Sequence, residues 1–170
     1  CLAMEDYNVL SLPAERVVVL VASTTGEGEV PDGMRAFWRF LLRKDLPPGS
    51  LHALRHATFG LGDSSYPKFN FAAKRLHRRL EQLGSAPLLP MGLGDDQDAL
   101  GIDQALGGWL DGLWAALGEV FPLPAGLEAA PLSELPPGER RGNTRPDPTP
   151  QRCAPLPRGA WAGPVGPGPG

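Results

Sequence analysis

Three short apolar runs occur along the chain, and each predicts a strand. They span Val17–Ala22, His56–Leu61 and Leu88–Leu93. The first run is β-branched and does not alternate with polar residues, which predicts a strand buried on both faces, as in a parallel sheet. Pro90 cannot donate to a sheet ladder, so we expect the third run at an edge. A weaker apolar signal at Leu2–Asp6 predicts the end of a further strand.

Helical periodicity follows each of the three runs. The first helix is expected to begin at Pro31–Asp32 and to stop at Pro47–Pro48, and the second to run from about Phe69, with Asn70 as its cap, to Gly84. A third helix follows the last run, and its internal glycines imply that tertiary packing must hold it. The residues expected on the buried helix faces are Met34, Phe37, Trp38, Leu41 and Leu42, then Phe69, Ala72, Ala73, Leu76, Leu80 and Leu83, then Leu106, Trp109, Leu110, Leu113, Trp114 and Leu117.

Strand, loop and helix thus alternate three times, which predicts an α/β fold with a doubly wound parallel sheet. Loops rich in Gly, Asp, Ser and Thr follow the strands at Ser23, Gly60 and Gly94. Because ligands of such sheets bind beyond the carboxyl ends of the strands, we expect the three loops to converge on one site. The segment Gly60–Asn70 has the composition of a ligand loop, since its glycines permit close approach of the backbone and Tyr66 supplies a flat ring.

Composition confines the expected fold to the first three quarters of the chain. The 170 residues are 42% apolar and 21% charged, which suggests one soluble domain. Between Pro131 and Gly170, 18 of 40 residues are Pro or Gly, well above the roughly 25–30% that signals low complexity. We therefore expect a domain over residues 1–127 and a disordered Pro/Gly-rich tail over residues 128–170.

The cysteines and the first residues of the chain indicate the cellular compartment that we expect. Cys1 and Cys153 lie at opposite ends, so we expect neither a disulfide framework nor a metal site of the C-x-x-C type, and a reducing, cytoplasmic compartment is the simpler interpretation. No apolar run approaches the ~20 residues of a membrane span, and the start lacks the features of a secretory signal. Because the first residue is Cys rather than Met, we interpret the chain as a fragment.

The second expected helix carries a basic face formed by Lys74, Arg75, His77, Arg78 and Arg79. Such a face is compatible with nucleic-acid binding. The formal net charge of -3 and the absence of an interleaved aromatic row favour a solvated face instead. We therefore expect no nucleic-acid partner.

The acidic loop residues have two interpretations of equal weight. They are either solvated charges or a rim that steers a basic partner toward one end of the sheet. The three histidines lack metal-ligand spacing, so we assign no role to His52, His56 or His77. The acidic set comprises Glu27, Glu29, Asp32, Asp63, Asp95, Asp96 and Asp98.

Three ordered motifs at the expected strand ends resemble the flavin loops of the flavodoxin-like FMN domain in diflavin reductases. They read T-G-E-G followed by P-D, then G-L-G-D-S-S-Y-x-K-F-N, then L-G-D-D-Q. Within that family, F-W-R-F-L-L-R-K and F-A-A-K-R-L-H-R-R-L-E-Q-L-G are most similar to the NADPH-dependent reductases of cytosolic iron–sulfur protein assembly. The resemblance covers about Leu2 to Leu127, and three motifs in order are far more specific than one glycine loop.

The resemblance implies that FMN lies among these loops, in a flavodoxin-like sheet. Tyr66 would stack on the isoalloxazine ring, a contact worth about 0.5–1.5 kcal/mol beyond area burial; alternatively, it is a partly buried packing residue. Thr25 stands where some relatives carry a second aromatic residue, which implies less cover for that face of the ring. The implied contacts are Ser23, Thr24, Thr25 and Gly26 beside the ring, Leu61, Gly62, Asp63, Ser64, Ser65, Tyr66, Pro67, Lys68, Phe69 and Asn70 around it, and Asp96.

The resemblance also implies an oxidoreductase function. In the family, NADPH passes a hydride to FAD, and electrons then move through FMN to an iron–sulfur acceptor of the anamorsin type in the cytoplasm. No side chain needs to act as acid, base or nucleophile. The family's first strand and its S-x-T-G-T-A phosphate loop would precede Cys1, so we expect an incomplete sheet that carries the ring-binding half of the site. Two alternatives stay open: a non-enzymatic fragment that binds the partner without flavin, and a reductase domain that serves a haem enzyme.

Overall fold

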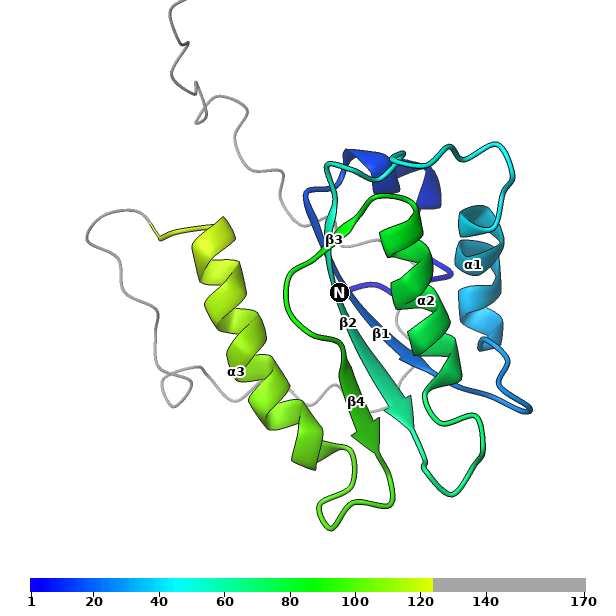
Figure 1. Ribbon diagram of the computed structural model, residues 1–170, viewed down its shortest axis with the longest axis vertical. Coiled ribbons are helices and arrows are strands. Elements are labelled where there is room, and N and C mark those ends of the chain that lie inside the picture. The colour runs from blue at the N-terminus through cyan, green and yellow to red at the C-terminus, as the bar shows by residue number, and fades with distance from the viewer. Residues whose placement is uncertain (124–170) are drawn as a thin grey trace, which may run out of the picture. The chain divides into compact units, whose positions relative to one another are not determined.

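The computed structural model describes residues 1–123, which form a parallel sheet with helices packed on it (Figure 1). β1 pairs along one edge of β2, while β3 and β4 pair in succession along the other edge. All of these pairings are parallel, as the alternation of strands and helices predicted. The strands are β1 (Val17–Ser23), β2 (Arg55–Gly62), β3 (Ala86–Pro87) and β4 (Gly92–Asp95).

The second predicted helix begins and ends near the residues that the sequence indicated, whereas the first ends at Leu41, well before Pro47. α2 stops before Gly84, whose φ of 94° is the left-handed conformation that glycine adopts after a helix. The first predicted helix is divided, because its opening turn is a 3-10 helix that continues directly into α1. The helices are η1 (Val9–Ala14), η2 (Asp32–Met34), α1 (Arg35–Leu41), α2 (Phe71–Gln82) and α3 (Asp103–Val120).

Helices α2 and α3 cover opposite faces of β2, so the fold is doubly wound. On one face, His77 of α2 lies 3.3 Å from the Thr58 hydroxyl. On the other, the Trp109 ring of α3 packs against Phe59 with 5.1 Å between the ring centroids. Successive residues of a strand point to opposite faces, so neighbouring positions of β2 contact different helices. The predicted fold class is confirmed.

The main core fills the layer between the sheet and the helix pair α1 and α2. Leu20 and Ala22 of β1 meet Leu41 of α1 and the fully buried Leu76 and Leu80 of α2. Burying a leucine side chain contributes about 1.5–3 kcal/mol, so this layer supplies much of the stability that fixes the strand ends.

One face of β1 is more open than predicted. Val19 and Val21 are 43% and 50% exposed, whereas the alternate residues Leu20 and Ala22 are buried. The helices α1 and α2 cover the face that carries Leu20 and Ala22. The valines point to the opposite face, where α3 packs on β4 at the far edge of the sheet. The prediction that this strand is buried on both faces is therefore wrong; within the sheet it is β2 that is buried along most of its length.

Three further predictions are corrected by the backbone and by burial. The segment Leu2–Asp6 forms a turn instead of a strand, because the Asp6 amide donates to the Ala3 carbonyl at 3.1 Å. Pro90 lies between β3 and β4 rather than inside an edge strand, and its carbonyl accepts a hydrogen bond from Trp109. Within the helix faces, Leu42 and Trp114 are exposed, and Leu113 is the one buried member of the α3 set. The members that are only half-buried are Phe69, Leu106, Trp109, Leu110 and Leu117.

The predicted tail over residues 128–170 lies outside the described residues, so the boundary after residue 127 stays a prediction. Of the helices within residues 1–123, none is both long enough and apolar enough to cross a membrane.

Candidate functional site

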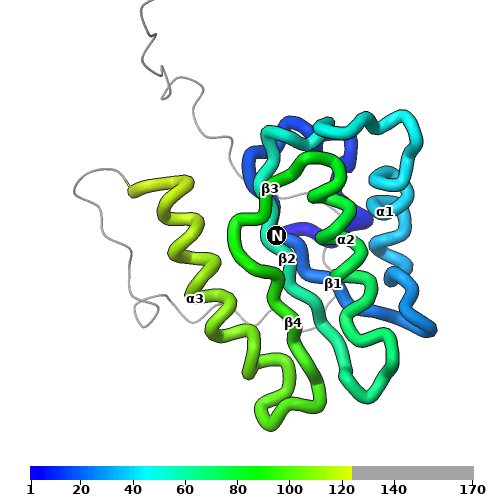
Figure 2. The backbone as a smooth tube through the Cα atoms, viewed as in Figure 1, coloured from blue at the N-terminus to red at the C-terminus, as the bar shows by residue number. Residues whose placement is uncertain are grey.

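The loops that follow β1, β2 and β4 emerge at the same end of the sheet, as predicted (Figure 2). They enclose a pocket of about 570 Å³. Eleven of the fifteen predicted contact residues line it, and the lining also includes Glu27 and Ile102. Four predicted residues do not line it: Ser23, Thr25, Ser64 and Ser65. The predicted residues that do are Thr24, Gly26, Leu61, Gly62, Asp63, Tyr66, Pro67, Lys68, Phe69, Asn70 and Asp96.

The loop after β1 is closed by its own hydrogen bonds. The Thr25 amide donates to the Glu29 carbonyl at 3.0 Å, and the Thr25 hydroxyl donates to the same oxygen at 3.3 Å. Gly26 turns the chain between them with a φ of 48°, a left-handed conformation that favours glycine. The Thr25 side chain is therefore occupied in holding the loop, which is why it does not face the pocket.

Thr24, rather than Asn70, caps helix α2. The Ala72 amide in the first turn of α2 donates to the Thr24 hydroxyl at 3.1 Å. Asn70 occupies the cap position, but its side chain makes no capping hydrogen bond. The sequence prediction of an Asn70 cap is wrong, because the neighbouring loop brings a hydroxyl to the amide that a cap would satisfy. This hydrogen bond ties the loop after β1 to the helix that follows β2.

Asn70 packs against the carboxyl ends of β2 and β4. It is fully buried with a φ of 54°, and its side-chain amide donates to the Gly94 carbonyl at 3.0 Å. A Cβ at Gly60 would lie 2.5 Å from Asn70 Oδ1, and one at Gly62 would lie 2.7 Å from Asn70 Cγ. The G-x-G spacing of this loop is therefore required for close approach of Asn70 to the backbone. Asn70 Oδ1 itself is buried and has no hydrogen-bond partner within residues 1–123.

Carboxylates connect the remaining loop backbones. Asp95 accepts hydrogen bonds from the Ser64 amide at 2.8 Å and from the Gln97 amide at 3.0 Å, so it joins the loops after β2 and β4. The hydrogen bond from Ser64 holds the pKa of the Asp95 carboxyl below its usual range. Asp63 accepts from the Ser65 amide at 2.9 Å within its own turn. The two serines thus shape the loop through their backbone amides.

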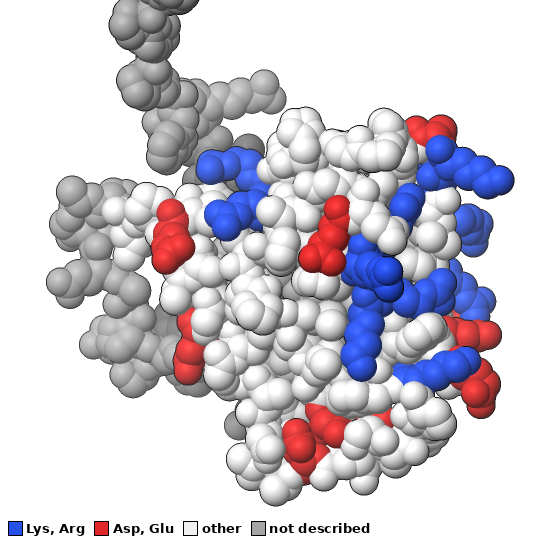
Figure 3. All heavy atoms as spheres, in the orientation of Figure 1, with Lys and Arg blue, Asp and Glu red and all other residues white. Residues whose placement is uncertain are grey.

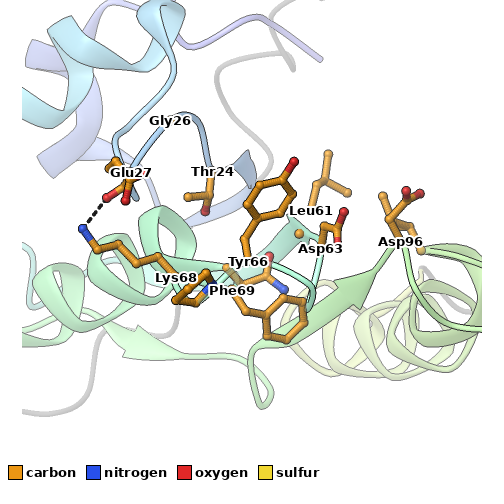
Figure 4. A pocket seen from close by; sticks show the side chains of 13 residues that line it. Thr24, Gly26, Glu27, Leu61, Asp63, Tyr66, Lys68, Phe69 and Asp96 are labelled. Carbon is orange, nitrogen blue, oxygen red and sulfur yellow. Dashed lines mark hydrogen bonds between the residues drawn. The ribbon is translucent and has the colours of Figure 1, made fainter.

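Tyr66 presents its ring in the pocket. The side chain is 64% exposed and stands between the Thr24 side chain and the Asp63 carboxylate (Figure 4). This exposure contradicts the alternative that Tyr66 is a partly buried packing residue. A flat ring with a free face in a concave pocket is suited to stack on another planar group.

The two lining residues outside the predicted set lie at opposite sides of the pocket. The Glu27 carbonyl accepts a hydrogen bond from the Lys68 ammonium, so the first two loops also meet there (Figure 4). Ile102 precedes the first turn of α3, which returns to the pocket after the loop of β4. The sequence signal for Glu27 was its place beside Gly26. The signal for Ile102 was an apolar residue at the start of the last helix.

The acidic residues of the loops are used in different ways. Glu27, Asp63 and Asp96 line the pocket. Asp95 bonds to loop amides, and Asp32 pairs with Arg35 at 2.8 Å on the surface. Acidic side chains are visible at the strand-end side of the molecule in Figure 3. Both interpretations, solvated charges and a steering rim, stay open.

The arrangement is suited to holding a planar ligand. It combines an exposed aromatic ring, apolar walls at Leu61 and Ile102, and carboxylates at Asp63 and Asp96. Within the part of the chain that the structure describes, no group of three or more His, Cys, Asp or Glu side chains is placed to hold a metal ion.

This chain is similar in sequence to one protein family and to several curated proteins. The sequence profile of the Flavodoxin family matches residues 1–109. The protein named NADPH-dependent diflavin oxidoreductase 1 is 52% identical to this chain over 126 residues in Xenopus laevis and 55% identical over 138 residues in Danio rerio. These alignments cover 74% and 79% of this chain, but only 21% and 23% of the relatives. The chain therefore spans about a fifth of the length of the curated relatives it matches.

Solved structures show the same likeness. A cysteine mutant of flavodoxin from Pseudomonas aeruginosa is 32% identical, with a TM-score of 0.52, and the match covers 61% of this chain and 68% of that one. Flavodoxin from Streptococcus pneumoniae has a TM-score of 0.53 over 66% of this chain and 74% of its own. At 20% identity, the second structure supports the likeness in fold alone.

Proposed function

Because this chain belongs to the flavodoxin family, we propose that its pocket binds FMN and that it serves as the electron-transfer domain of an NADPH-dependent diflavin oxidoreductase. The relatives at about half identity are named as oxidoreductases. The observation that carries the proposal is the exposed ring of Tyr66 in the pocket where three strand-end loops converge.

The pocket fits a planar ring in size and in chemistry. Its volume of about 570 Å³ falls within the roughly 300–1,000 Å³ of cofactor sites. Tyr66 offers an aromatic face, while Leu61 and Ile102 give apolar walls that exclude water from a bound ring. Asn70 also lines the pocket, and its fully buried side chain packs against Gly60 and Gly62.

When bound, FMN would supply the redox chemistry, since it accepts and donates electrons singly or in pairs. The protein's part is to bind and to orient. Tyr66 would cover one face of the ring, and the backbone of Gly26 would lie at its edge, in a loop already closed by Thr25. Asp63 and Asp96 place negative charge beside the pocket, which disfavours added negative charge on a bound group. We keep the predicted contact set as a proposal and add Glu27 and Ile102 to it.

The finer role follows from the relatives' name and from the motif resemblance. We propose that electrons from NADPH reach this domain through FAD in a separate domain, and leave it for an iron–sulfur acceptor of the anamorsin type in the cytoplasm. The relatives are more than four times as long as the matched segment, so there is room in them for the FAD and NADPH domains. The alternatives are a fragment that docks on the partner without flavin, and a reductase domain serving a haem enzyme.

Titration of the purified chain with FMN tests the cofactor. We expect saturable quenching of flavin fluorescence, and we expect Tyr66→Ala to weaken FMN binding by roughly tenfold or more because it removes the stacking face. Tyr66→Phe keeps the ring and is the matched control, with affinity expected within about threefold of the unmodified chain. Flavin fluorescence that stays unquenched, with all flavin lost on desalting, would establish the flavin-free alternative for this chain.

Acceptor choice needs a second experiment. The FMN-loaded chain is reduced chemically and mixed, in a stopped-flow instrument, with oxidised anamorsin or with cytochrome c. We expect faster re-oxidation by anamorsin at equal concentrations. Faster re-oxidation by cytochrome c would favour the haem-enzyme alternative and leave FMN binding unaffected.

A further inference from the structure

The outer face of helices α1 and α2 concentrates positive charge. Residues 35–44 and 71–80 contain eight Lys and Arg side chains and no Asp or Glu, which is half of the sixteen Lys and Arg residues of the chain. Figure 3 shows the basic side chains gathered over these two helices. The whole chain has a formal net charge of -3, so this basic face is a local excess.

A hollow of about 210 Å³ lies within the basic face, between α1 and α2. Trp38 and Leu42 of the α1 segment form its apolar floor, and Arg75, Arg78, Arg79 and Gln82 of α2 form the rest of the lining. Leu42, which the helical pattern predicted to be buried, is 48% exposed here. The hollow therefore combines the half-exposed Leu42 side chain, beside the buried Trp38 ring, with guanidinium groups.

Two of the arginines are held in place. The Arg75 guanidinium stacks over the Trp38 ring at 5.0 Å from its centroid and lies 5.6 Å from that of Phe71. The Arg79 Nε donates to the Leu41 carbonyl at 2.8 Å. Because these side chains are already ordered, less conformational entropy is lost when they bind a partner.

Carboxylates near this face are paired with other groups. Asp32 pairs with Arg35 and Asp45 pairs with Arg43, while Glu81 lies 3.8 Å from the His77 ring, which is charged only when protonated. Within residues 1–123, no ion pair joins Arg75, Arg78 or Arg79 to a carboxylate. The guanidinium groups around the hollow therefore keep their charge available for a partner.

We propose that the hollow between α1 and α2 is a docking site for an acidic segment of a partner protein, in which one aliphatic side chain packs on the exposed Leu42 and flanking carboxylates pair with Arg75 and Arg78. Arginine forks match carboxylates in geometry. A nucleic acid is disfavoured because its bases need a free aromatic face, and the Trp38 ring is covered by Arg75 and only 9% exposed.

The docking site is independent of the proposed flavin site. The hollow lies on the helix pair, whereas the pocket lies at the strand ends and carries Glu27, Asp63 and Asp96. An acidic segment is repelled by that pocket and attracted by the helix face. Loss of FMN binding would therefore leave the docking proposal unaffected.

The test uses fluorescence anisotropy with the full chain at low salt. The probe is a labelled peptide with one leucine between two runs of three glutamates. We expect saturable binding, weakened about fivefold or more by Arg78→Glu, which replaces an attractive pair with a repulsive one. Lys44→Glu makes the same charge change on the basic face but outside the hollow, and we expect it to change the affinity less than twofold. Circular dichroism checks that both variants are folded.

Two further probes make the test specific. Replacing the leucine of the peptide with serine should weaken binding several-fold, since the hollow then loses its apolar contact. A labelled single-stranded oligonucleotide of equal charge should bind more weakly than the acidic peptide. The proposal is overturned if the peptide does not bind below about 1 mM, a limit near -4 kcal/mol, if Lys44→Glu weakens binding as much as Arg78→Glu, if the serine peptide binds equally well, or if the oligonucleotide binds more tightly.

Discussion

The two ends of β2 differ in whether the buried polar groups around them have hydrogen-bond partners. Near the amino end, buried His56 lies with Nδ1 2.8 Å from the Ser85 hydroxyl, and that hydroxyl donates to the Leu54 carbonyl at 3.0 Å. The hydroxyl has used its one proton, so His56 Nδ1 must be the donor to it. His56 Nε2 is then the acceptor, 3.2 Å from Nδ1 of His77. Each polar atom in this chain of hydrogen bonds has a protein partner.

At the carboxyl end, the strand opens into the pocket. Gly60 and Gly62 bring the backbone against Asn70, whose Oδ1 is buried without a partner within residues 1–123. Tyr66 is largely exposed a few residues further along. Buried polar groups in folded proteins are nearly always paired. The comparison teaches that the buried polar side chains of His56 and Ser85 at the amino end complete their hydrogen bonds within the protein, whereas the carboxyl end leaves one buried amide oxygen without a partner and an aromatic ring exposed in the pocket.

Acidification should give the largest loss of folding stability, through His56 near the amino end of β2. Burial, with a smaller contribution from the charge of His77, lowers the pKa of His56 from 6.5 to about 4. The unfolded chain therefore binds this proton between pH 6.5 and about 4 while the folded chain does not, so stability is lost as the pH falls through that window. The shift corresponds to a loss of about 3 kcal/mol by pH 4.

Urea denaturation at pH 7 and pH 4 measures this loss. His56→Gln removes the titrating group, so the variant should lose less stability on acidification than the unmodified chain, although it is less stable at pH 7. His52→Gln is the control, because His52 is exposed and bonds only to the Gly49 carbonyl within residues 1–123. An equal pH dependence in His56→Gln and the unmodified chain would contradict the prediction.

Gly60→Ala, near the carboxyl end of β2, should give the next largest loss of stability. The new Cβ would lie 2.5 Å from Asn70 Oδ1 and 3.0 Å from the Ala73 Cβ. Asn70 is held by its bond to Gly94, so it cannot move aside freely. We expect the free energy of unfolding to fall by roughly 1–3 kcal/mol, as for other overpacked sites, and FMN binding to weaken.

A glycine in α3 supplies the matched control. A Cβ at Gly107 would meet no atom within 4 Å, so Gly107→Ala should stabilise the helix by up to about 1 kcal/mol. Thermal unfolding followed by circular dichroism compares the two alanine variants. A Gly60→Ala protein as stable as the unmodified chain would show that Asn70 relaxes without cost.

Thr24→Val should give the smallest of the three effects. The substitution removes the hydroxyl that accepts from the Ala72 amide and so leaves the first turn of α2 without its cap. The loss of a cap costs about 1 kcal/mol. Thr25→Val is the control with an expected cost below about 0.5 kcal/mol, because the Thr25 amide still closes the loop onto Glu29. Chemical denaturation of both variants would refute the cap if Thr25→Val were the more destabilising.

Some of the candidate site was predictable and some was not. The three loops, their convergence and most pocket residues followed from local composition and from the rule that ligands bind at the carboxyl ends of strands. Thr25, Ser64 and Ser65 were predicted to contact the ligand, but their hydrogen bonds hold the loops closed. Thr25 does so through its hydroxyl, whereas Ser64 and Ser65 do so through their backbone amides. A residue that shapes a loop and one that faces the ligand have the same sequence signal. Only the positions of the neighbouring loops distinguish them.

The sequence by itself determined the order of strands and helices, the parallel sheet and the glycine and tyrosine of the ligand loop, because these depend on residues close together in the chain. Tertiary structure alone decided which partner each group meets. It gave the cap of α2 to Thr24 rather than Asn70, left Val19 and Trp114 exposed, and brought His56 against Ser85 and His77. These outcomes depend on contacts between residues up to 48 positions apart, which no local pattern encodes.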